Sequence, residues 1–194
     1  MIPGLLVPAA KAFAYIPPIV YIFRERRKMN RSWEELGLKF HDFKKDLFDN
    51  WYLILIVAVF LQLPIVLIGK FYWTELFTHI KDRIPLINSS AIGYLILIIL
   101  VIPLLEELIY RGLFQQRLSW YLNGFVAVLI ASFIFGLQHF TPGKPVIVAV
   151  DVAGVVVDGM IYGLIFARCR NVFVSWTAHV AADLIGLAFL LLLV

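Results

Sequence analysis

The sequence predicts an all-α integral membrane protein, a bundle of about six transmembrane helices with further helices at the membrane interface. The chain of 194 residues is 62% hydrophobic, whereas soluble domains are usually about half apolar. Several windows of roughly 20 residues contain few charges, which is the pattern of membrane-spanning helices. Cys169 is the single cysteine, so an internal disulfide and a cysteine-based zinc site are excluded. A net charge of +4 is ordinary for a membrane protein, and we expect no nucleic-acid partner.

The predicted spans differ in how clearly the sequence marks them. The first, residues 2–23, is interrupted by Lys11, Pro17 and Pro18, so we expect it to be kinked or only partly embedded. Two later segments mix aromatic with charged residues, which is typical of helices on the membrane surface. These interfacial segments are residues 24–50 and 70–85. The other spans are residues 51–69, 91–106, 123–140, 146–167 and 172–194.

The span that begins at Ala91 carries charge where a membrane helix should be apolar. Residues 88–90 offer N-cap side chains, and the helix extends through Glu106 toward Leu118. Pro103 lies inside it and should kink it one turn before Glu106. One charge near the centre of a membrane helix costs about 2.5–3.5 kcal/mol on insertion scales. The charged groups here therefore need partners, water or a function.

Spacing separates the two adjacent glutamates, Glu106 and Glu107. Glu107 and Arg111 are four residues apart with the acid first, the favourable order for a helical ion pair. Glu106 points about 100° away from Glu107, so it is free to serve as a general base. The alternative is that all three residues form one structural ion-pair network.

Two histidines lie in the following spans. Phe135 and His139 are four residues apart on one helix, so the two rings can pack together. In an antiparallel hairpin that turns near Trp120, Glu106 and His139 differ in height by only about 7–8 Å, and we expect them to share a site. His179 and Asp183 are also four apart, on one face of the last span.

Asp151 and Asp158 lie seven residues apart on one helical face, together with glycines suited to close helix packing. We expect these aspartates to line a polar cavity or to pair with Arg or His. A proton-coupled transporter using them as a relay is a further hypothesis, although the two halves of the chain show no internal symmetry.

The candidate residues favour hydrolysis by an activated water, because no Ser or Cys lies beside a base as covalent catalysis requires. Two versions remain open. In the metal version, Glu106, His139 and His179 are the candidate ligands of a zinc ion that acidifies a bound water. In the metal-free version, Glu106 and His139 activate the water, while His179 and Asp183 stabilise the oxyanion.

Three motifs in this order resemble those of the CPBP family. They are Glu106-Glu107-xxx-Arg111, Phe135-xxx-His139 and His179-xxx-Asp183. The family includes the type II CAAX prenyl endopeptidases and bacteriocin-processing or Abi-type membrane proteins. The resemblance covers residues 91–194, and residues 1–90 carry no recognisable motif.

The resemblance implies an intramembrane endopeptidase, often classed as a metalloprotease, that cleaves a membrane-tethered or prenylated peptide. It places the catalytic roles on Glu106, His139, His179 and Asp183, with Glu107, Arg111 and Phe135 in support. Prenyl endopeptidases usually have asparagine at the position of Asp183. The alternative that it leaves open is a non-catalytic bacteriocin-immunity or partner-binding membrane protein.

The predicted architecture is one transmembrane domain, residues 1–194. Residues 1–90 form a membrane and interfacial N-terminal part, and residues 91–194 form a catalytic helix core. The distribution of Lys and Arg orients the chain in the bilayer. It predicts an N-terminus on the outside and an active-site cavity nearer the cytoplasmic side.

Overall fold

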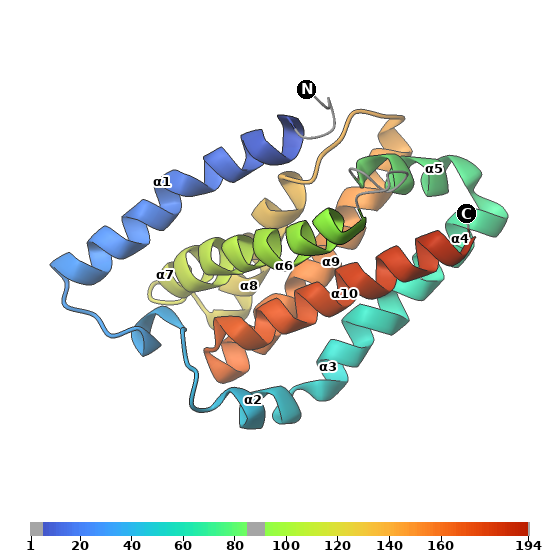
Figure 1. Cartoon of the computed structure of the whole chain (residues 1–194). Coiled ribbons are helices and arrows are strands. Elements are labelled where there is room, and N and C mark those ends of the chain that lie inside the picture. The colour runs from blue at the N-terminus through green and yellow to red at the C-terminus, as the bar shows by residue number, and fades with distance from the viewer. Residues whose placement is uncertain (1–5, 85–91, 194) are drawn as a thin grey trace.

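The structure, a computed structural model, describes residues 6–84 and 92–193. Within these residues every regular element is a helix and none is a strand, so the predicted all-α class is confirmed. The N-cap predicted over residues 88–90 and the helix start at Ala91 lie outside the described residues. Figure 1 shows the helices gathered around α10 (Val172–Leu193), which runs beside α6 and α9.

A glycine-rich hairpin forms one side of the bundle. It consists of α8 (Gly124–Leu137) and α9 (Pro145–Cys169), which pack closely along their lengths. A Cβ added to Gly159 would come within 2.9 Å of the Phe135 ring. The absence of a side chain at Gly159 therefore lets α9 approach α8, as the small-residue pattern predicts.

A second long helix crosses the opposite side. It runs through α3 (Trp51–Leu55), the π-helical segment η3 (Ile56–Leu61) and α4 (Gln62–Tyr72). A short helix, α5 (Thr74–Arg83), folds back onto α4 and reaches α9.

The glutamates lie at the end of α6 (Ile92–Glu107), where the helical geometry changes. A π-helix, η4 (Leu108–Gln115), follows directly, and α7 (Gln116–Leu118) ends the segment. Pro103 lies inside α6, one turn before the change. Single π-helical turns within longer helices often occur at functional sites.

The N-terminal part wraps the edge of the bundle. The first helix, α1 (Leu6–Lys28), packs on α6 and η4 at the edge seen in Figure 1. It continues through Pro17 and Pro18 and extends five residues beyond the end predicted at residue 23. A 3-10 turn, η2 (Glu34–Leu36), and α2 (Phe43–Asp49) lead to the second long helix.

Three helices among the described residues are long and apolar enough to cross a membrane. They are Trp51–Tyr72, Pro145–Cys169 and Val172–Leu193, while the apolar helix Gly124–Leu137 is shorter. These three correspond to the predicted spans 51–69, 146–167 and 172–194. The count of six spans is not confirmed, and spans at residues 2–23, 91–106 and 123–140 stay predictions.

Candidate active site

The ion pair predicted within the glutamate helix is present and fully buried. Arg111 Nε lies 3.3 Å from Glu107 Oε2, an ionic contact that does not reach hydrogen-bond geometry. Arg111 also donates from Nη2 to the carbonyl oxygen of Gly159 at 2.8 Å. The guanidinium thus links α9 to the helix that carries the glutamates, and Glu107 is neutralised where the spacing predicts.

His179 of α10 joins both glutamates. Its Nδ1 lies 3.0 Å from Glu107 Oε1, and because an ionised carboxylate can only accept, Nδ1 carries the proton. Its Nε2 points toward Glu106 Oε2 at 3.8 Å and Asp183 Oδ2 at 3.9 Å. Neither distance is a hydrogen bond. We call Glu106, Glu107, Arg111, His179 and Asp183 the acid–histidine cluster.

One carboxylate oxygen of Glu106 accepts two hydrogen bonds, and the other faces His179. Tyr15 of α1 donates to Oε1 at 2.6 Å, and Gln138 Nε2 donates to the same oxygen at 3.2 Å. The second oxygen, Oε2, faces His179. Arg111 therefore pairs with Glu107, while Glu106 has other partners.

Phe135 stands between the two histidines. Its ring centroid lies 4.7 Å from that of His139 and 5.6 Å from that of His179, both edge to face. His139 Nδ1 lies 2.9 Å from the Phe135 carbonyl oxygen, so Nδ1 is again the protonated nitrogen. In the neutral ring Nε2 is then the basic nitrogen. The Arg111 guanidinium also lies over the Phe135 ring, 5.1 Å from its centroid, so one residue of each predicted motif lies beside Phe135.

Of the two aspartates of α9, Asp151 pairs with Arg and His as expected, whereas Asp158 pairs with a glutamine. Asp151 lies 2.9 Å from Arg83 and 3.4 Å from His79. Asp158 accepts from Gln62 at 3.1 Å. Ser175, four residues before His179, donates to the Tyr162 carbonyl, which is a structural role.

The sequence leaves open whether the protein binds zinc. Among the described residues, no group of three or more His, Cys, Asp or Glu side chains is arranged to hold a metal ion. In particular, Nδ1 of His179 is taken by Glu107, and its Nε2 is shared between two carboxylates at nearly 4 Å. Within the described residues, the present arrangement therefore does not fit a zinc site.

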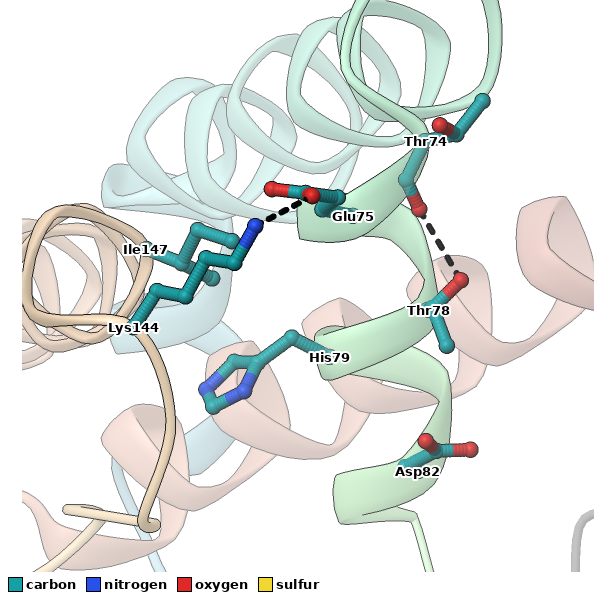
Figure 2. Close-up of a pocket in the computed structure, with 7 residues that line it drawn as sticks. All are labelled: Thr74, Glu75, Thr78, His79, Asp82, Lys144 and Ile147. Atoms are coloured by element: carbon teal, nitrogen blue, oxygen red, sulfur yellow. Dashed lines mark hydrogen bonds and ion pairs between the residues drawn. The ribbon is translucent and has the colours of Figure 1, made fainter.

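A separate polar pocket lies on the surface between α5 and the start of α9 (Figure 2). We call it the surface pocket, and it contains none of the predicted site residues. Lys144 reaches across to Glu75, with both side chains mostly exposed. The residues that line the surface pocket are Thr74, Glu75, Thr78, His79, Asp82, Lys144 and Ile147.

Sequence reasoning missed the residues that hold Glu106. Gln138 precedes His139, and Tyr110 precedes Arg111, so both could have been considered as neighbours of the motifs. Tyr162, whose ring stacks on His179 at 4.5 Å, lies one helical turn from Asp158. Tyr15 gave no signal, because it is 91 residues from Glu106 in the chain.

Comparison with known proteins gives a family match for the second half of the chain. The family model described as type II CAAX prenyl endopeptidase Rce1-like matches residues 88–185, just over half of the chain. That segment contains every predicted site residue. No curated protein and no solved structure matches the chain.

Proposed function

The chain belongs to the Rce1-like family of type II CAAX prenyl endopeptidases, and from this premise we propose that it hydrolyses a peptide bond by a water activated by Glu106 and His139. The family is one of peptidases. With three helices able to cross a bilayer, the protein is an integral membrane protein. We infer a substrate that is itself membrane-tethered or prenylated, since such a peptide can reach a site within the bundle.

The observation that carries the proposal is the gap between Glu106 Oε2 and His179 Nε2. The two side chains are each 6% exposed, and these atoms lie 3.8 Å apart. This is too far for a direct hydrogen bond, but a water about 2.8 Å from each atom fits between them. The two hydrogen bonds that hold Glu106 both go to its other oxygen, Oε1.

The proposed roles follow from the protonated nitrogens. Glu106 takes the proton of the water, with the basic Nε2 of His139 as the second acceptor, and the water oxygen attacks the carbonyl carbon. The carbonyl oxygen becomes an oxyanion. When the carbon–nitrogen bond breaks, the proton passes from Glu106 to the departing amine.

Stabilisation of the oxyanion is assigned to α10. Because Nδ1 of His179 is fixed on Glu107, its Nε2 is the nitrogen that donates when the ring is protonated. Asp183 can donate only as the carboxylic acid. Fixed donors of this kind typically contribute about 10²–10³ to the rate.

Placement in the membrane extends the proposal. The basic residues of segment 24–50 and of the turn after α9 support a cytoplasmic position for these regions. The N-terminus would then lie outside, and the acid–histidine cluster would open nearer the cytoplasmic side.

The test is cleavage of a farnesylated peptide ending in a CAAX sequence by purified protein in lipid vesicles. We expect Glu106→Gln and His139→Ala each to reduce cleavage to a small residual rate while the thermal unfolding temperature stays within a few degrees of wild type. Glu75→Gln, the same change in the surface pocket, is the matched control and should leave the rate unchanged. Wild-type rates in both site variants would reject the assignment and favour a non-catalytic, partner-binding protein.

Metal content is measured on the same preparations. Elemental analysis with and without a chelator, combined with the cleavage assay, tests for zinc. Stoichiometric zinc whose removal abolishes cleavage would replace the metal-free mechanism with a zinc-assisted one.

A further inference from the structure

Two donors from different helices converge on the same oxygen of Glu106. Tyr15 Oη and Gln138 Nε2 both contact Oε1, at 2.6 and 3.2 Å. Hydrogen bonds to an ionised oxygen are among the strongest in proteins. With Oε1 held twice, rotation of the carboxylate is restricted and Oε2 is directed at the gap beside His179.

The amide of Gln138 is itself oriented. Tyr110 Oη donates to Gln138 Oε1 at 2.9 Å, so the amide nitrogen is the end that faces Glu106. The reversed amide would set its oxygen against the carboxylate oxygen. Tyr110 and Gln138 thus form one chain of hydrogen bonds that ends on Glu106 Oε1, and Tyr15 donates to the same oxygen separately.

Tyr15 comes from a helix that the family match does not include. The match covers residues 88–185, whereas Tyr15 lies on α1, which packs on α6 and η4 at the edge of the bundle (Figure 1). Tyr15 and Ile22 turn inward with 6% exposure each, while Phe13, Ile16 and Tyr21 face outward. The inward tyrosine is a polar residue on the face that α1 uses for packing.

From these contacts we propose that Tyr15 and Gln138 are positioning residues for Glu106, and that α1 is therefore part of the catalytic unit. The inference rests on the proposed function. Tyr15 does not touch the reacting atoms; it acts through the carboxylate. Small misplacements of a catalytic group can lower the rate by about 10²-fold. Loss of one of the two hydrogen bonds to Glu106 Oε1 should therefore lower turnover strongly without abolishing it.

The kinetic test uses Tyr15→Phe, which removes only the hydroxyl, and Tyr21→Phe as the matched control on the outer face of the same helix. With the farnesylated peptide as probe, we expect Tyr15→Phe to lower kcat by about 10- to 100-fold with little change in KM. Added to Glu106→Gln, Tyr15→Phe should cause no further loss, because it acts through that carboxylate. An unchanged kcat, or a further loss in the double variant, would overturn the proposal.

A second measurement does not depend on cleavage. Dicyclohexylcarbodiimide, an apolar reagent for carboxyl groups, is applied to the protein in vesicles, and labelled Glu106 is quantified by mass spectrometry. Freeing Oε1 should raise the labelling rate of Glu106 several-fold in Tyr15→Phe and leave it unchanged in Tyr21→Phe. Equal labelling in the two variants would contradict the positioning role of Tyr15. Faster labelling of Tyr15→Phe, together with no cleavage by the wild type, would instead reject the proposed function and leave the positioning of Glu106 by Tyr15 intact.

Discussion

The acid–histidine cluster and the surface pocket use similar side chains in opposite ways. Each sets a histidine beside carboxylates and an arginine. In and around the pocket the charges form simple pairs, Lys144 with Glu75 and Arg83 with Asp151, and the first pair is largely exposed. In the cluster, three carboxylates surround the His179 imidazole and only one of them, Glu107, also pairs with Arg111; among the three, only Asp183 is more than slightly exposed.

The difference shows that residue type alone does not identify an active site. An exposed ion pair is solvated and contributes at most about 1 kcal/mol. Inside a bundle, an acceptor left facing a gap is costly unless something fills that gap. The oxygen of Glu106 that faces His179 is such an acceptor, and the surface pocket holds no residue of the predicted motifs.

Substitution of one histidine in each region should give the largest difference in kcat. We expect His179→Gln to lower kcat for the farnesylated peptide by about 10²–10³-fold, because the proposed oxyanion donor is lost. His79→Gln should leave kcat within about twofold, since His79 pairs with Asp151 and Thr141 and lies outside the acid–histidine cluster. Equal losses would show that the two histidines are not functionally distinct.

The two arginines should differ in stability. Arg111→Met leaves Glu107 buried beside only His179, and we expect the free energy of unfolding to fall by about 3–5 kcal/mol. Arg83→Met should cost less, on the order of 1–2 kcal/mol, because the Arg83 side chain is 25% exposed and its pair with Asp151 is partly solvated. Detergent-denaturant titration of both variants measures the difference. If Arg83→Met proves as destabilising as Arg111→Met, burial is not what separates the regions.

A smaller contrast tests the packing beneath each region. A methyl group at Gly159 would meet the Phe135 ring, which is wedged between two histidines and cannot easily move. We expect Gly159→Ala to lower the free energy of unfolding by about 1–3 kcal/mol and to reduce cleavage. At Gly143 the methyl would meet the His79 ring at 3.1 Å, and a shift of a few tenths of an ångström suffices, so Gly143→Ala should be milder. The reverse order would show that Phe135 is not held rigidly.

Local spacing explains what the sequence could predict. The four-residue separations of Glu107 from Arg111 and of Phe135 from His139 correspond to contacts in the structure. The predicted pairing of Asp151 with Arg or His is also confirmed. These contacts follow from helix periodicity or from the need to neutralise a buried charge. Both features can be recognised in the sequence.

What could not be predicted depends on contacts between distant segments. Tyr15 meets Glu106 across 91 positions, and Gln62 meets Asp158 across 96. The π-helix after Glu107 has no signature in the apolar pattern, because that pattern continues through Leu108 and Ile109. α1 extends to Lys28 and so includes charged residues, whereas the apolar pattern predicts that the span ends at residue 23.

The central claim is that Glu106 and His139 act on one water molecule, and a double-mutant cycle tests it most directly. Single-turnover cleavage of the farnesylated peptide would be measured for Glu106→Gln, His139→Ala and the combined variant. If both groups activate the same water, the combined variant should be no slower than the slower single variant. Losses that multiply would mean that the two residues act independently, and the shared site would be contradicted.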